Sequence, residues 1–280
     1  MRQVGAMTDH FSVIGFKSSS AEELTELIGK LPNTGAFSQP CPPGYYYRWH
    51  SDSGSELWVH LAKEAGGGEE KLNIVGVTPF FQGTGRIPVR VMKKRQRPGD
   101  NAFEGAVFVE IEPGPRPHQC ATVALLDVVD YAVWMNRVTP FLAQAQIAAF
   151  PHELAVYRSE EEFTEAQADE QVKFSPESFF ASGLFSGSGQ TGGQAVFHDP
   201  SAKDFNAPAR AFFTGRVLSA ELRKNAVTGQ SFYAALVKTL GGTIDMVADP
   251  KLLAETLRPG CIVQGEFWLC VRLIEGNGHG

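Results

Sequence analysis

The chain has 280 residues, of which 43% are hydrophobic and 20% charged, so its composition is that of a globular protein and not of a fibrous or disordered one. No apolar run approaches the roughly 20 residues that a membrane-spanning helix needs, so the sequence predicts no such helix. The net charge of -6 is concentrated in residues 101–180, which carry 4 basic and 13 acidic residues. This acidic segment argues against tight nonspecific binding of nucleic acid by the whole chain.

The first part of the chain predicts one helix among several strands. Residues 11–16 form a short apolar run that favours a strand, and Ser20 with Glu23 has the form of a capping box that begins a helix. Proline and glycine predict a loop over residues 32–44. A turn at 51–55 then joins two predicted strands of a hairpin, 45–50 and 56–62. Further strands are expected at 72–77, 87–92, 106–111 and 122–128.

The middle of the chain contains a predicted helix and a predicted linker. Residues 141–149 are compatible with either a short helix or a strand. Ser159 and Glu162 repeat the capping-box pattern and predict a short acidic helix. The stretch 183–193 is rich in glycine and serine and has no hydrophobic periodicity, which is typical of a flexible connector. We therefore expect a sheet domain at 7–182, a linker at 183–208 and a second domain at 209–275.

The last part of the chain has the clearest strand pattern. Strands are predicted at 212–222, 231–240 and 243–248, and Asp249 followed by Pro250 marks the start of a short helix. A final strand is expected at 261–273, with a bend or bulge at Gly265. This order of elements resembles the OB-fold, which implies a small barrel over 209–275. The fold class is therefore predicted as α+β: a mostly antiparallel sheet with a covering helix, followed by an OB-like β-barrel.

The order of elements that follows His10 is also similar to a module of the vicinal oxygen chelate fold. In that family the first strand often carries a metal-binding histidine, so the resemblance implies His10 as a metal ligand. A metal there would need a further ligand such as Glu56, His60 or Glu110. Glu56 and His60 cannot bind one ion together from a single strand, because four residues span about 13 Å of extended chain.

The predicted hairpin has one polar face and one apolar face. Strand alternation places side chains of opposite chemistry on the two faces, and His50 is expected to lie opposite Glu56. The polar face is either a solvated surface or the wall of a ligand pocket. The candidate ligand-binding residues on it are Arg48, His50, Glu56, Trp58 and His60.

The basic run at residues 93–97 is the densest positive segment of the chain. It is either an anion or nucleic-acid site, or a charged strand end that protects a sheet edge. In the C-terminal domain, the geometry by which OB-folds bind oligonucleotides implies contacts from the predicted first hairpin and the strand after it. The candidate contact residues for nucleic acid or a partner are Arg223, Lys224, Phe232, Tyr233, Lys238 and Trp268.

The parity of the last strand predicts that Trp268 points away from the barrel interior, where it is either exposed or covered by the N-terminal domain. We favour packing between the domains, and a pocket at that contact would be the natural place for a small ligand. The four cysteines include no Cys-x-x-Cys pair, and no secretory signal is evident, so buried free thiols and a cytoplasmic location are expected.

No complete set of catalytic residues is recognisable, and no cofactor is indicated. The leading hypothesis is a non-catalytic binding or accessory protein that acts through protein or small-ligand contacts, with a protein partner or a second copy of the chain as partner. A metal-dependent enzyme of the vicinal oxygen chelate type and single-stranded nucleic-acid binding by the OB-like domain are the alternatives.

Overall fold

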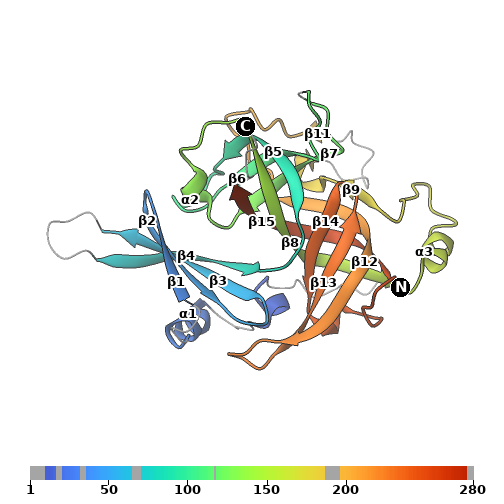
Figure 1. Cartoon of the computed structure of the whole chain (residues 1–280), viewed down its shortest axis with the longest axis horizontal. Helices are drawn as coiled ribbons and strands as arrows, with labels where there is room; N and C mark the ends of the chain where they lie inside the picture. Colours follow the sequence, from blue (N-terminus) through green and yellow to red (C-terminus); the bar gives the residue numbers. More distant parts are fainter. Residues whose placement is uncertain are drawn as a thin grey trace.

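The computed structural model describes residues 10–16, 21–31, 36–64, 71–116, 118–186 and 196–275. In these ranges the protein is rich in strands, which form a four-stranded antiparallel sheet and a nine-stranded mixed sheet. Figure 1 shows the smaller sheet, in blue, beside the larger one. No helix within the described ranges is long and apolar enough to cross a membrane.

The small sheet has the strand order β1-β2-β3-β4, with bounds Ala36–Cys41, Gly44–His50, Ser55–Lys63 and Leu72–Phe81. The predicted hairpin is confirmed, and His50 lies opposite Glu56 as expected. The predicted loop at 32–44 is wrong in part, because β1 lies within it. Pro40 is compatible with this strand because β1 is at the edge of the sheet, where a missing N–H breaks no ladder of hydrogen bonds.

Two short helices adjoin this sheet at its N-terminal side. The predicted helix is confirmed as α1, Ala21–Gly29, although its capping residue Ser20 lies outside the described residues. The predicted strand at 11–16 is wrong, because Ser12–Ile14 forms a single 3₁₀ turn, η1, that ends at Gly15 with a φ of 84°. The carbonyl of Ile14 accepts hydrogen bonds from the side chains of Ser55 and Asn225, so side chains and not a neighbouring strand satisfy this segment.

The large sheet contains the strands predicted in the middle of the chain. They are β5 (Ile87–Arg95), β6 (Ala106–Ile111), β7 (Thr122–Val128) and β8 (Phe141–Tyr157). The short helix α2, Tyr131–Trp134, connects β7 to β8. The open choice at 141–149 is resolved as a strand. The acidic helix is confirmed as α3, Glu160–Ala166, in which the Ser159 hydroxyl accepts a hydrogen bond from the Glu162 N–H.

The remaining strands complete the large sheet, except for β10 and β11, which pair with each other as a separate two-stranded sheet. They are β9 (Ser178–Phe180), β10 (Phe185–Ser186), β11 (Val196–Phe197), β12 (Arg210–Lys224), β13 (Ser231–Thr239), β14 (Gly242–Ala248) and β15 (Ile262–Glu275). The 3₁₀ helix η2 spans Ser182–Leu184. The predicted helix after Asp249 is only the 3₁₀ turn η3, Pro250–Leu252, although Asp249 caps it as expected.

Strand pairing in the large sheet closes two rings that share β8 and β15. The first ring runs β5-β6-β7-β15-β8 and returns to β5, and the second runs β12-β13-β14-β8-β15 and returns to β12. In each ring the third strand pairs in parallel with one of its two neighbours: β7 pairs in parallel with β15, and β14 with β8. Strands from both sides of the predicted linker at 183–208 therefore belong to one sheet. The second ring includes β8, which lies outside the range 209–275 predicted for the second domain.

The shared strands separate two hydrophobic cores. Alternate residues of β15, such as Leu269 and Val271, are buried with the core of the rings. Cys270, between them, faces the second core, where Trp58 and Phe80 of the small sheet pack. Trp268 shares this face, as its parity predicts, and the small sheet is thus fixed against the outer face of the β8–β15 pair.

Candidate functional site

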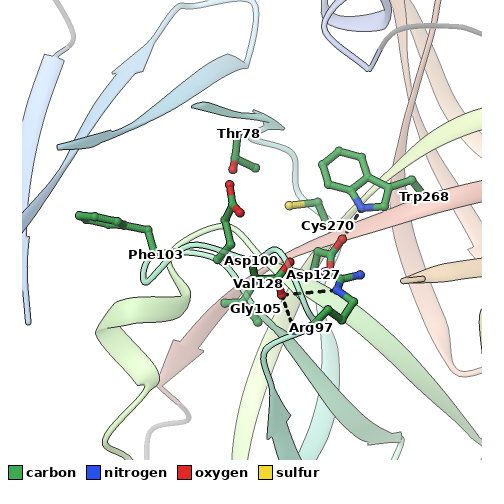
Figure 2. A pocket seen from close by; sticks show the side chains of 10 residues that line it. Thr78, Arg97, Asp100, Phe103, Gly105, Asp127, Val128, Trp268 and Cys270 are labelled. Atoms are coloured by element: carbon green, nitrogen blue, oxygen red, sulfur yellow. Dashed lines mark hydrogen bonds and ion pairs between the residues drawn. The ribbon is translucent and has the colours of Figure 1, made fainter. Parts of the chain in front are cut away.

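A cavity of about 160 Å³ lies where the small sheet meets the first ring of strands. Figure 2 shows its lining, which comes from β4, the segment between β5 and β6, β7 and β15. The charged and polar side chains in the lining are those of Thr78, Arg97, Asp100, Glu104 and Asp127. A cavity of this size holds a ligand about as large as benzene.

One wall of the cavity is a chain of hydrogen-bonded charges. The Arg97 guanidinium forms ion pairs with Asp100 and Asp127, and the Asp100 carboxylate also accepts the Arg97 backbone N–H at 2.8 Å. The Trp268 indole N–H donates to Asp127 Oδ2 at 2.7 Å. Burial raises the pKa of Asp127, and the contacts with Arg97 and Trp268 oppose that shift. Arg97 and the tryptophan therefore hold Asp127 in place at the junction of β7 and β15 (Figure 2).

Another wall of the cavity contains Glu104 and Thr78. Glu104 Oε2 accepts the backbone N–H of Asn101 at 3.2 Å, and burial raises the pKa of this carboxyl group. No lysine or arginine side chain of the described residues forms an ion pair with Glu104. Among the described side chains, its negative charge therefore has no basic partner in direct contact.

Behind this wall lies His60, whose side chain is 1% exposed. Its Nε2 is 3.2 Å from the Thr78 hydroxyl, and its Nδ1 is 3.8 Å from Glu104 Oε1 and has no hydrogen-bond partner. Burial lowers the pKa of His60 to about 4, so the imidazole is neutral at pH 7. The ring also stacks on Phe103, with centroids 5.4 Å apart. His60 thus links two residues of the cavity wall from within the protein.

Of the five candidate ligand-binding residues on the hairpin, the structure brings only His60 to this cavity wall. Glu56 is fully buried beside two guanidinium groups, 3.0 Å from Arg48 and 3.5 Å from Arg272. The Trp58 indole N–H donates to the same carboxylate at 2.8 Å. These charges neutralise each other between the two sheets. Glu56, Trp58 and His60 of the polar face are thus buried in the contact between the sheets and are not solvated.

His10 stacks flat on Trp268, with ring centroids 4.3 Å apart, and lies 5.3 Å from the ring of His152. Burial lowers the pKa of His10 to about 4, and the charges of His152 and Arg210 add to this shift. Within the described ranges no three histidine, cysteine, aspartate or glutamate side chains come together as a metal site. The metal-binding role of His10 therefore has no support from neighbouring ligands.

The residues proposed for nucleic-acid contact do not form one platform. Phe232 is fully buried, 6.1 Å from the ring of Phe81, and cannot stack on a base as it is placed. Lys238 forms an ion pair with Glu177 at 3.3 Å, and Arg223 one with Glu221 at 3.0 Å. Tyr233 is half-buried against the core of the rings, and Lys224 is exposed.

A second hollow, a groove of about 680 Å³, lies over β12, β13 and β14, with Arg223 and His50 in its lining. Asp245 also lines it, but this carboxylate accepts the backbone N–H groups of Thr84 and Gly85 and the amide of Gln146. Asp245 therefore fixes the segment between β4 and β5.

Sequence reasoning named the contact at Trp268 as the natural place for a small ligand but missed the charged residues that line the cavity there. Arg97 closes the basic run at 93–97, and Pro98-Gly99 after it predicts a turn that returns the chain. This turn carries Asp100 and Glu104 to the side of Asp127. No spacing along the chain indicates that proximity, because Asp127 belongs to another strand.

The comparisons with known proteins add no assignment. No protein-family model matches the chain, and neither a curated protein nor a solved structure matches it.

Proposed function

We propose that this protein is a non-catalytic binding protein and that its ligand occupies the cavity between β4, the β5–β6 segment, β7 and β15. The observation that carries the proposal is the convergence of polar groups from both sheets on one hollow of about 160 Å³. Binding sites for small molecules are concave, occur where structural units meet, and combine apolar walls with a few oriented polar groups. The cavity has each of these properties.

The chemistry of the lining favours recognition over catalysis. Asp100 and Asp127 are both engaged by Arg97, so neither is a free general base. Burial raises the pKa of the Cys270 thiol well above its usual range, which disfavours the thiolate that a nucleophile requires. Asp100, Asp127 and Trp268 are held in fixed positions by their mutual contacts and those with Arg97, which favours the recognition of a small ligand.

We further propose that the two rings of strands are OB-type barrels that share β8 and β15. In the first ring β8 is the fourth strand and β15 the fifth, and in the second ring β15 is the fourth strand and β8 the fifth. In both rings a short helical element separates the third and fourth strands, and the third strand pairs in parallel with the fifth, which is the order of the OB-fold. The cavity adjoins the connection between the first and second strands of the first ring. OB-folds use that connection for ligands, so the proposed fold supports the proposed site.

The test is a nuclear magnetic resonance titration that follows the indole N–H signal of Trp268, because this N–H lies in the cavity wall. The probes are millimolar small cations, anions and neutral molecules of about eight non-hydrogen atoms, a size that matches a benzene-sized cavity. At least one class is expected to shift the signal in a saturable manner. If no class shifts it, the proposed ligand site is wrong.

A variant that fills the cavity provides the control for location. Thr78→Leu places a larger apolar side chain in the lining and should abolish the shift. Val75→Leu changes an exposed residue of the same strand and should leave the titration unaltered. Equal binding by both variants would place the ligand elsewhere and contradict the proposal.

A further inference from the structure

The charges around the cavity do not balance. The lining contains three carboxylates, those of Asp100, Glu104 and Asp127, and one cation, Arg97. With the usual charges at pH 7 the net charge of the lining is 1 minus 3, or -2. A small anion would meet repulsion there, whereas a bound cation would compensate charge that the protein leaves uncompensated.

Arg97 is not available to an incoming anion. Its guanidinium pairs with Asp127 on one side and with Asp100 on the other, at 3.5 Å for the Arg97 Nε to Asp100 Oδ2 contact. A carboxylate or phosphate ligand would have to displace one of these partners. Glu104, by contrast, has only a backbone N–H as donor among the described contacts, so it is the group with acceptor capacity to spare.

The uncharged part of the lining suits the stem of an organic cation. Trp268 and Phe103 contribute aromatic side chains, and Val128 contributes an apolar one. Such side chains form the apolar walls that suit the stem of a small ligand. Aromatic and apolar side chains are not ligands for a bare metal ion. In addition, no three metal-ligand side chains of the described residues come together.

His60 provides an independent sign that Glu104 lacks a partner. The imidazole is 1% exposed, and its Nδ1 is directed at Glu104 Oε1 from 3.8 Å, which is beyond hydrogen-bond distance. A buried ring nitrogen without a partner costs free energy. The wall formed by His60, Thr78 and Glu104 thus contains hydrogen-bonding atoms, His60 Nδ1 and Glu104 Oε1, that have no hydrogen-bond partner among the described residues.

We infer that the ligand of this cavity is a small organic cation, a guanidinium or primary ammonium group on a short apolar stem, bound by Glu104 and the Thr78 hydroxyl beside the Trp268 ring. This inference rests on the proposed function, because it names the chemical class for the same site. The planar guanidinium group presents several N–H donors at once and pairs well with carboxylates.

Three probes of matched shape and different charge test the class: butylguanidinium, butyrate and 1-butanol, each titrated by isothermal calorimetry at low salt. Butylguanidinium is expected to bind at least tenfold more tightly than the other two. Glu104→Gln, which keeps the shape of the side chain and removes its charge, should weaken butylguanidinium binding about tenfold, in line with the loss of one charge-assisted hydrogen bond. Glu161→Gln removes an exposed carboxylate on α3 and should leave the affinity unchanged.

The outcomes separate this inference from the proposed function. Tighter binding of butyrate or butanol, abolished by Thr78→Leu, would overturn the cation class and leave the ligand site intact. Butylguanidinium binding that Glu104→Gln does not weaken would overturn the role of Glu104 and with it this inference. Failure of all three probes to bind or to shift the Trp268 signal would overturn both.

Discussion

Cys270 of β15 lies directly opposite Ala148 of β8, and each of these residues also pairs with an aspartate on a parallel strand. Asp127 pairs with Cys270 and Asp245 pairs with Ala148, so the four residues form one row across β7, β15, β8 and β14. Asp127 lies in the cavity and Asp245 in the groove. The two rings of strands therefore place equivalent side chains on either side of a central pair of small residues.

The small size of this central pair allows the small sheet to pack closely. Ala148 and Cys270 are both fully buried, in one core with Trp58 of the small sheet. We predict that Ala148→Leu lowers the free energy of unfolding by about 1–3 kcal/mol, because the added atoms overpack this contact. Urea denaturation measures the change. Ala168→Leu, at an exposed position after α3, should alter stability by less than about 0.5 kcal/mol.

The buried carboxylate of Glu56 supports a second prediction. It lies between the guanidinium groups of Arg48 and Arg272, so Glu56→Gln leaves two partly buried cations without this counter-charge. We expect a loss of about 3–5 kcal/mol in the free energy of unfolding, measured by chemical denaturation. Glu275→Gln removes the same charge from the exposed pair with Arg137 and should cost at most about 1 kcal/mol. Similar losses in both variants would contradict the assigned role of Glu56.

Local patterns in the sequence predicted the strands well where turns and alternation coincide. The bounds of β6 and β7 agree with prediction to the residue, and the hairpin register between His50 and Glu56 is confirmed. The strand predicted at 11–16 was wrong because so short an apolar run fits any buried segment. Side chains distant in sequence, such as Asn225, stabilise the 3₁₀ turn instead.

The closure of the rings and the composition of the cavity could not be predicted in the same way. The closure of the rings depends on β8, a strand of 17 residues that pairs with β5, β14 and β15. Such pairing is set by long-range packing and leaves no local signal in residues 141–157. The position of Trp268 could be predicted from strand parity alone, whereas the approach of Arg97 to Asp127 required the folded sheet.

Gly83 supports a third prediction, about the segment that joins the two sheets. A Cβ atom at this position would lie 2.1 Å from the Cγ atom of Asp245, whose carboxylate accepts the N–H groups of Thr84 and Gly85. Gly83→Ala should therefore break these hydrogen bonds and lower the free energy of unfolding by about 2 kcal/mol or more. Gly29→Ala, where nothing lies within 4 Å, should be neutral or slightly stabilising at the end of α1.

The fourth prediction concerns the dependence of stability on pH. Burial raises the pKa of Asp130 to about 7, and the hydrogen bond from the Trp134 indole opposes the shift. In the unfolded chain an aspartate has a pKa of about 3.9. Between these two values the folded protein retains a proton that the unfolded chain has released. The contribution of Asp130 to stability is therefore complete below about pH 4 and is lost as the pH rises through about 7.

Asp130→Asn keeps the side-chain oxygen that accepts from Trp134 but cannot ionise. We predict that this variant gains stability relative to the native protein between pH 5 and pH 8, as measured by urea denaturation at both pH values. Trp134→Phe removes the donor to the carboxylate and should move the loss of stability to higher pH, since that hydrogen bond favours the charged form. A difference between native protein and Asp130→Asn that does not change with pH would show that Asp130 does not titrate in this range.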